Sequence, residues 1–204
     1  MDNISLFGTP VATGIIADII TDEEKQFLHS IKTMRMASDN GYHSLNVQIL
    51  NLPELAELKQ KLFNQFLYYT ESIGISKKVE WKMVTSWLNM HVKGDWAHQH
   101  LHKNSLFAGI LYTQVDENSG DLVFHNQPHS LNLIPSTIAL EMETFNACNS
   151  NSWNVTPSNN SLVFFPSTLL HSVNPNQSDI ERYSVAFNFF PIGKIGYGIE
   201  DLSV

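Results

Sequence analysis

The sequence predicts an α+β fold of mainly β structure, and two observations carry the prediction. The first third of the 204-residue chain has apolar residues at helical spacing, whereas from about Trp81 onward short aromatic and β-branched runs alternate with turn residues. No internal repeat and no linker rich in Pro or Gly divides the chain. We therefore expect one domain over residues 1–204, mainly helical at 1–80 and a β-sandwich or jelly roll at 81–204, with the helices packed on one sheet.

Two helices are expected in the N-terminal part. Thr21-Asp22-Glu23-Glu24 has the form of a capping box, and four apolar residues follow it at helical spacing: Phe27, Leu28, Ile31 and Met34. Asn51 can cap a second helix, with Pro53 in its first turn and a stop at Gly74. The second helix has one apolar stripe, which we expect to pack on the core: Leu55, Leu58, Leu62, Phe66 and Tyr69.

The β part is predicted from short apolar runs bounded by turn residues. The expected strands are near 81–92, 96–102, 106–115, 121–125, 137–142, 161–165 and 182–190. The segment 146–160 is crowded with Asn and Ser and is expected to be an exposed loop.

Charge and composition exclude several classes of protein. Lys and Arg number 12 against 20 Asp and Glu, so the formal net charge of -8 argues against binding nucleic acid or an anionic membrane by bulk electrostatics. No run of about 18 apolar residues without charge is present, and no basic segment precedes the apolar stretch near Met1. The single cysteine, Cys148, cannot form an internal disulfide. We expect a cytoplasmic protein that does not bind membranes.

Histidines are concentrated in one short segment. Four of the nine fall within residues 91–102, and three of those, His98, His100 and His102, would point to one face of a strand. A His-x-His pair on a strand gives a metal ion two adjacent ligands with little loop to order. The alternative is a surface strand that happens to be rich in histidine.

A third histidine and an arginine follow later in the chain. His171 comes shortly after the apolar run 161–166, at the end of an expected strand, which makes it a plausible third ligand. Arg182 is one of only two arginines and opens a strand on which period two places it on the same face as Ser184. Buried charge requires a partner, so Arg182 backed by Ser184 is a candidate to hold a substrate or cofactor carboxylate. The alternative is a structural ion pair with an Asp or Glu.

Motifs spread over residues 6–190 resemble the 2-oxoglutarate/Fe(II) oxygenase family found in bacteria and their viruses. The resemblance rests on the order and spacing of several short motifs together: Leu6-Phe7-Gly8-Thr9-Pro10, Ser38-Asp39-Asn40-Gly41-Tyr42-His43-Ser44, Ser86-Trp87-Leu88-Asn89, Gly94-Asp95, His100-Leu101-His102, Gly109-Ile110-Leu111-Tyr112, Gly120-Asp121-Leu122-Val123-Phe124, Phe165-Pro166, His171-Ser172-Val173-Asn174-Pro175 and Arg182-Tyr183-Ser184-Val185-Ala186-Phe187-Asn188.

This resemblance implies a double-stranded β-helix core with an iron site. It implies Fe(II) and 2-oxoglutarate as metal and cosubstrate, dioxygen as co-reactant, and hydroxylation of a C–H bond in a small molecule or a protein side chain. The compartment would be the bacterial cytoplasm, or the host cytoplasm for a viral protein. Neither the primary substrate nor the oligomeric state is indicated.

The ligand set departs from the commoner pattern of the superfamily. His102 stands where an Asp or Glu usually completes two histidines and one carboxylate, and no acidic residue occurs between Asp95 and Asp116. The metal is held either by three histidines, His100, His102 and His171, or by two histidines with a remote carboxylate such as Asp121. We favour three histidines.

Further roles follow from the same resemblance. Asn89 lies eleven residues before His100, the spacing at which alkylation-repair demethylases place a cosubstrate-binding Asn, and this selects His100 and His102 as the pair. Arg182 and Ser184 would hold the 5-carboxylate of 2-oxoglutarate, and Tyr112 could add its hydroxyl. His98 would then lie beside the ligands or in the pocket wall, and His91 either lines the same cavity or is a structural histidine.

Two other functions are compatible with three histidines. A zinc hydrolase uses three histidines and a water, but this leaves Arg182 unexplained. A non-catalytic cupin-like binding module would place Gly94 six residues before His100, but the acidic residue expected after the histidine pair is missing.

Overall fold

The computed structural model describes residues 8–36, 40–126, 140–196 and, for the backbone, 202–203. Its helices are two α-helices and two 3-10 turns: α1 (Asp22–Ser30), η1 (Ile49–Asn51), η2 (Pro53–Leu55) and α2 (Ala56–Ser72). Its strands are β1 (Ala12–Ile15), β2 (Thr33–Arg35), β3 (Tyr42–Ser44), β4 (Glu80–His91), β5 (Ala97–His100), β6 (Phe107–Gln114), β7 (Leu122–His125), β8 (Ser152–Val155), β9 (Ser161–Pro166), β10 (His171–Val173), β11 (Arg182–Ile192), β12 (Lys194–Ile195) and β13 (Leu202–Ser203).

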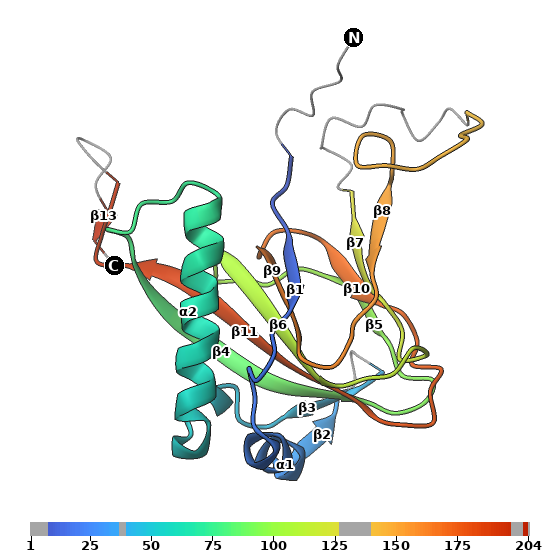
Figure 1. Cartoon of the computed structure of the whole chain (residues 1–204), viewed down its shortest axis with the longest axis horizontal. Coiled ribbons are helices and arrows are strands. Elements are labelled where there is room, and N and C mark those ends of the chain that lie inside the picture. Colours follow the sequence, from blue (N-terminus) through green and yellow to red (C-terminus); the bar gives the residue numbers. More distant parts are fainter. Residues whose placement is uncertain (1–7, 37–39, 127–139, 197–201, 204) are drawn as a thin grey trace.

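Two antiparallel sheets form the body of the fold (Figure 1). The major sheet has seven strands in the order β1-β9-β6-β11-β4-β3-β2, and the minor sheet has four in the order β5-β10-β7-β8. Strands distant in sequence are neighbours in both sheets, as in a double-stranded β-helix. The predicted mainly β fold with a jelly-roll core is confirmed.

The helices cover one face of the major sheet, as the sequence predicts. On α2 the apolar stripe is buried, and Phe66 stacks on Phe189 of β11 with ring centroids 3.6 Å apart. Figure 1 shows α2 beside the major sheet, on the side away from the minor sheet. No helix in the described residues combines the length and the apolar run that crossing a membrane would require.

A second apolar cluster lies between the two sheets. It joins Ile110 of β6 and Phe165 of β9 to Phe124 of β7, whose ring centroid lies 5.1 Å from that of Phe165. Alternate residues of β6 therefore face opposite layers, with Phe107 and Leu111 toward the helices and Ile110 and Tyr112 toward the minor sheet. This second layer carries the pocket described below.

The helix boundaries differ in part from the predicted ones. The capping box is confirmed, because Thr21 Oγ1 accepts from the Glu24 N–H while the Glu24 carboxylate accepts from the Thr21 N–H. The helix nevertheless ends at Ser30, and Met34 lies in β2. The prediction of Asn51 as the second cap is wrong. Leu52 is extended because it precedes Pro53, the residues Pro53–Leu55 form a 3-10 turn, and the α-helix begins at Ala56 with Leu55 as its N-cap.

Several strands were not predicted, or were predicted at other bounds. β5 covers 97–100 rather than 96–102, because the His102 N–H bonds to the Ser167 carbonyl instead of continuing the ladder. The expected loop at 146–160 contains β8, which pairs with β7. Residues 137–139 of the expected strand 137–142 lie outside the described residues, and 140–142 are irregular. The short strands β1, β2, β3 and β10 were not predicted.

Candidate metal centre

Three histidines meet at one end of the minor sheet. His100 ends β5, His171 begins β10 directly opposite it, and His102 follows two residues after His100. One ligand nitrogen from each ring lies within 4.8 Å of the other two. The centroid of the His171 ring is 4.3 Å from that of His100 and 5.0 Å from that of His102. The structure thus brings together the three histidines that the sequence singles out.

Hydrogen bonds set the same tautomer in all three rings. Nδ1 of His100 lies 2.8 Å from the His98 carbonyl, and Nδ1 of His171 lies 2.9 Å from the Leu169 carbonyl. A carbonyl oxygen can only accept, so each Nδ1 carries the proton. The unprotonated Nε2 of each ring is then the atom available to a metal.

Asn188 does for His102 what the backbone does for the other two histidines. Its Oδ1 accepts from Nδ1 of His102 at 2.7 Å, while its Nδ2 donates to Oγ1 of Thr85 at 2.8 Å. The bond to Thr85 holds the far end of the amide in place. The contact of Asn188 with His102 was not anticipated from the sequence.

Two of the three imidazoles are held neutral. Burial, opposed by the hydrogen bond that His102 donates to Asn188 and reinforced by nearby His100, lowers the pKa of His102 to about 4. Burial, together with the neighbouring His100 and His102, lowers the pKa of His171 to about 3. Neutral imidazole is the form that binds a metal ion, so this cluster suits a divalent cation.

Within the described residues, no carboxylate joins the histidine cluster. Asp121, the remote carboxylate considered above, accepts a hydrogen bond from Asn154 at 3.1 Å and does not line the pocket. His98 is exposed and its side chain lies outside the pocket, although its carbonyl holds His100. The donor set present is three imidazoles.

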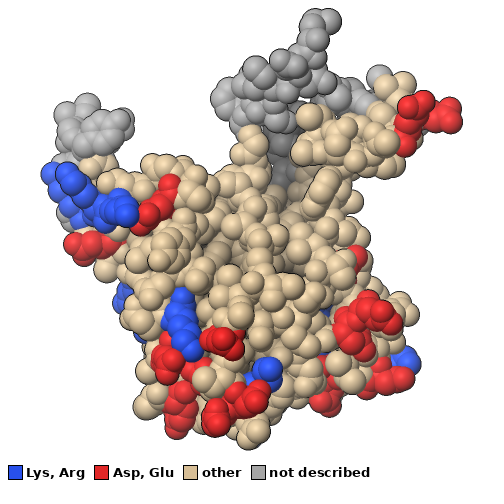
Figure 2. Space-filling model, viewed as in Figure 1, with Lys and Arg blue, Asp and Glu red and all other residues tan. Residues whose placement is uncertain are grey.

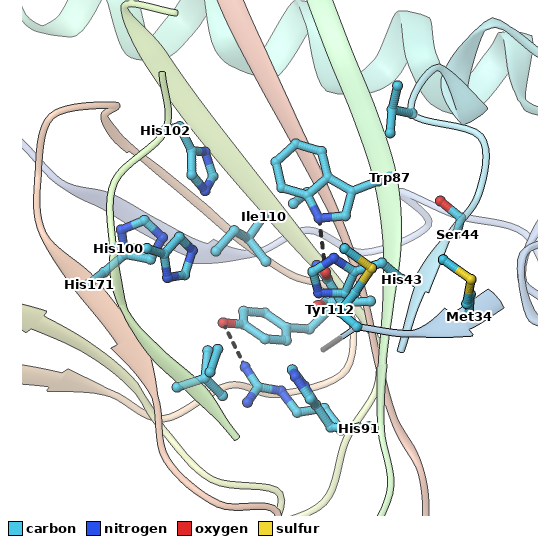
Figure 3. A pocket seen from close by; sticks show the side chains of 18 of the residues that line it. Met34, His43, Ser44, Trp87, His91, His100, His102, Ile110, Tyr112 and His171 are labelled. Atoms are coloured by element: carbon cyan, nitrogen blue, oxygen red, sulfur yellow. Dashed lines mark hydrogen bonds between the residues drawn. The ribbon is translucent and has the colours of Figure 1, made fainter. Parts of the chain in front are cut away.

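The histidines border a pocket of about 440 Å³ between the two sheets (Figure 3). Arg182 lines its other end and is only 2% exposed. One nitrogen of its guanidinium donates to the Tyr112 hydroxyl at 3.2 Å, whereas Nε and Nη1 have no hydrogen-bond partner among the described residues. Among the described residues Arg182 forms no ion pair with an acidic side chain, whereas the other arginine, Arg35, pairs with Asp95.

The other predicted cosubstrate residues lie in one row across three strands. Ser184 of β11 is opposite Asn89 of β4 on one side and opposite Tyr112 of β6 on the other. All three line the pocket, and Oδ1 of Asn89 accepts from the indole N–H of Trp87 at 2.9 Å. The register of the major sheet therefore places Asn89, Tyr112, Arg182 and Ser184 on one wall.

Part of the pocket was not anticipated from the sequence. The segment that contains β2 and β3 supplies a largely apolar edge: Met34, Met36, Leu45 and Val47. Met34, Leu45 and Val47 are each more than half exposed, so the pocket opens past them. Met34 lies at helical spacing from Leu28 and Ile31, and this pattern concealed its position on a strand.

Comparison with known proteins agrees with this geometry. No curated protein matches the chain in sequence. Among solved structures, an oxidoreductase of the 2OG-Fe(II) oxygenase family from Burkholderia pseudomallei is similar, with a TM-score of 0.61, 13% identity, and coverage of 88% of this chain and 83% of that one. HygX from Streptomyces hygroscopicus, solved with nickel and 2-oxoglutarate, has a TM-score of 0.61 at 12% identity, covering 90% and 84%.

A Pseudomonas putida prolyl-4-hydroxylase is also similar, with a TM-score of 0.56, 13% identity, and coverage of 91% of this chain and 94% of that one. At these identities the likeness shows a shared fold. The family model described as "Putative 2OG-Fe(II) oxygenase" matches residues 85–188, just over half of the chain and the part that holds all three histidines and Arg182. The chain belongs to this family of 2-oxoglutarate- and Fe(II)-dependent oxygenases.

Proposed function

We propose that this protein hydroxylates a C–H bond of a small molecule or a protein side chain, with His100, His102 and His171 as the iron ligands and Arg182 as the anchor of 2-oxoglutarate. One observation carries the proposal: three imidazoles with free Nε2 atoms and a buried arginine without an acidic partner border the same pocket. A metal at one end and a carboxylate at the other would satisfy both sets of atoms.

The residues present fit Fe(II) and 2-oxoglutarate. Imidazole suits iron as a ligand, and three ligands from one side leave coordination positions for other molecules. When bound, the metal and cosubstrate supply the oxidation, in which dioxygen converts 2-oxoglutarate to succinate and carbon dioxide and one oxygen atom enters a C–H bond of the substrate. Arg182 would orient the cosubstrate by a charge-assisted hydrogen bond to its 5-carboxylate, with Tyr112, Ser184 and Asn89 around it.

The rest of the pocket favours an apolar group as the reacting part of the substrate. Along the edge formed by β2 and β3, the side chains of Met34, Leu45 and Val47 offer few hydrogen-bonding atoms. The polar lining residues of this edge are His43 and Ser44, whose hydroxyl already donates to the Asn46 carbonyl, and the indole N–H of Trp87 is already bonded to Asn89. A charged group buried against this surface would lose its hydration without compensation. A pocket of about 440 Å³ is at the small end of the range for ligand sites, so one side chain or a compact molecule fits beside the cosubstrate.

Charge and compartment agree with such a substrate. On the face shown in Figure 2, acidic side chains lie beside the basic ones, and together with the net charge of -8 this disfavours a long nucleic acid. Two of the similar structures carry names of this kind of molecule: HygX was also solved with hygromycin B bound, and the prolyl-4-hydroxylase is named for proline. We place the protein in the cytoplasm, where a reducing environment keeps iron ferrous.

Succinate formation tests the proposal. Iron-loaded protein should turn 2-oxoglutarate into succinate slowly in the absence of substrate, and His171→Ala should not. Addition of a neutral apolar substrate should accelerate the reaction, whereas charged analogues should not. Because three imidazoles also suit zinc, a zinc hydrolase is the competing function. If iron-loaded protein neither binds 2-oxoglutarate nor releases succinate, while zinc-loaded protein hydrolyses esters, the oxygenase proposal is wrong.

A further inference from the structure

His91 is a buried histidine that has no hydrogen-bond partner for its ring. It ends β4, lines the pocket and is 4% exposed. Neither Nδ1 nor Nε2 has a partner among the described residues. A buried polar atom without a partner costs free energy, so an imidazole with two such atoms in a pocket wall indicates a residue that binds a ligand.

The neighbours of His91 define the kind of ligand. In the β4–β11 register His91 is directly opposite Arg182, whose Nε and Nη1 also have no partner. Figure 3 shows His91 and Tyr112 near one another, at the end of the pocket remote from His102. Burial, then the charge of Arg182 and the nearby His43, lowers the pKa of His91 to about 3. The neutral ring has one N–H to donate, beside a permanent positive charge.

Gly41 leaves the space that the ring of His91 occupies. A Cβ at residue 41 would lie 2.5 Å from Cδ2 and 2.6 Å from Nε2 of His91, so any side chain there would displace the imidazole. The φ angle of Gly41 is not in the left-handed region, so the close approach itself explains the glycine. The family-like motif around Gly41 thereby acquires a physical role: it leaves room for His91 to face the pocket.

We propose that His91 is a cosubstrate-binding residue, whose ring N–H donates to the distal carboxylate that Arg182 anchors. This inference rests on the proposed function, because it takes 2-oxoglutarate as the ligand. A carboxylate has two oxygens that accept several hydrogen bonds, so it can satisfy Arg182 and His91 together. A neutral ligand would leave the arginine charge without compensation.

A pair of ligands isolates the distal carboxylate. 2-Oxovalerate has the same five-carbon chain as 2-oxoglutarate, with a methyl group in place of the 5-carboxylate. The affinities of both should be measured with Mn(II)-loaded protein for the parent and for His91→Phe, which keeps a ring and removes both nitrogens. The parent should prefer 2-oxoglutarate. In His91→Phe its affinity should fall about 10-fold or more, while that of 2-oxovalerate changes less than about 2-fold, because only a charge-assisted hydrogen bond is lost.

Matched variants separate binding from folding. His98→Phe makes the same substitution at a histidine whose side chain lies outside the pocket, and should leave the ratio of the two affinities unchanged. His91→Asn retains an N–H donor and should recover part of the preference; it also serves if the phenylalanine variant fails to fold. Gly41→Ala should lower the preference by displacing the ring.

Each remaining outcome is decisive. If His91→Phe and His91→Asn both keep the parental preference, or lose affinity for both ligands equally, His91 is a structural residue and the inference is wrong. If the parent binds neither ligand while holding Mn(II), the proposed cosubstrate is wrong and the inference fails with it. The two failures differ in the parent protein alone.

Discussion

The two faces of β11 bury their side chains in different ways. Toward the helices, Val185, Phe187 and Phe189 are fully buried, and Phe189 stacks on α2. Toward the minor sheet, Arg182, Ser184 and Asn188 are almost as deeply buried but polar: they are 2%, 4% and 5% exposed. Alternate residues of one strand therefore contribute to an apolar core and to a polar cavity.

The difference lies in what remains unsatisfied. On the helix side, the side chains of Val185, Phe187 and Phe189 have no hydrogen-bonding groups, so close packing alone satisfies them. On the pocket side, buried nitrogens of Arg182 and His91 have no partner in the described chain, and the lone pairs of three imidazoles converge. A protein that retains such atoms at the cost of stability uses them to bind ligands. Five predictions set this polar face against the apolar one.

The largest effect is expected from the histidines. His171→Ala should abolish stoichiometric iron binding and succinate formation, because two imidazoles alone form an incomplete site. Metal analysis of the purified variant is the measurement. Asp121→Ala should keep its iron, since Asp121 is bonded to Asn154 away from the cluster. Iron retained in His102→Ala but lost in Asp121→Ala would instead make the carboxylate a ligand.

Acid should destabilise the metal-free protein through the pocket face. His91, His102 and His171 have folded-state pKa values of about 3 to 4, below the unfolded value of 6.5. The unfolded chain therefore binds more protons below pH 6.5, and stability present above that pH is lost as pH falls toward 4. At pH 5 we expect a loss of about 1–2 kcal/mol for each histidine. Chemical denaturation at pH 7 and pH 5 measures the loss of stability, and His91→Phe should remove the part that comes from His91.

On the apolar face, a single truncation should affect stability and spare the chemistry. Phe187→Ala should lower the free energy of unfolding by about 3–5 kcal/mol, because it leaves a cavity in place of a fully buried ring. Below its melting temperature the variant should still bind one iron per chain. Loss of iron in folded Phe187→Ala would instead mean that the two faces of β11 are coupled and do not act independently.

This division was largely predictable on β11 because a long strand has a clear period. The alternation of Tyr183, Val185 and Phe187 with Ser184 and Ala186 assigns each residue to a layer without further information. Short elements carry no such signal. Strands β2, β3 and β10 have three residues each, and they form only because the sheets offer them partners. Helix spacing that extended to Met34 concealed β2 for the same reason.

The site residues that carry distinctive functional groups at recognisable spacing were predictable from the sequence. The contacts between them, which depend on packing, were not. His100, His102, His171 and Arg182 stand out as uncommon residues at ordered spacing. The partner of His102 does not, because Asn188 lies 86 residues away and any amide on that face would look alike in the sequence. Nor could a sequence show that both ring nitrogens of His91 lack partners, since that is a property of everything packed around them.

A weaker effect should follow from the arginine. Arg182→Gln should reduce 2-oxoglutarate affinity by about 100-fold, close to 2.7 kcal/mol, and lysine should restore the charge without the planar set of donors. The free energy of unfolding without ligand should not fall, because the buried charge has no acidic partner to lose in the described part of the chain. Titration with Mn(II) in place of iron and thermal melts give both quantities. Variants that bind the cosubstrate normally but melt many degrees lower would make Arg182 structural.

The smallest effect is expected for Asn188, a residue of the polar face that would orient the metal ligand His102 without binding the metal itself. Asn188→Leu keeps a similar volume but removes the acceptor for Nδ1 of His102, which frees that ring to turn or to change tautomer. Iron affinity should fall about 10-fold, close to 1.4 kcal/mol, and Asn188→Asp should restore it because a carboxylate also accepts from Nδ1. Thr85→Val should cost less, since it only releases the far end of the amide. Competition with a chelator of known affinity measures all three. If Asn188→Leu binds iron like the parent, the orientation of the His102 ring is set by packing against Trp87 and Phe165, whose ring centroids lie 5.3 and 6.1 Å from its own. Apolar contacts would then orient a metal ligand on the polar face as well.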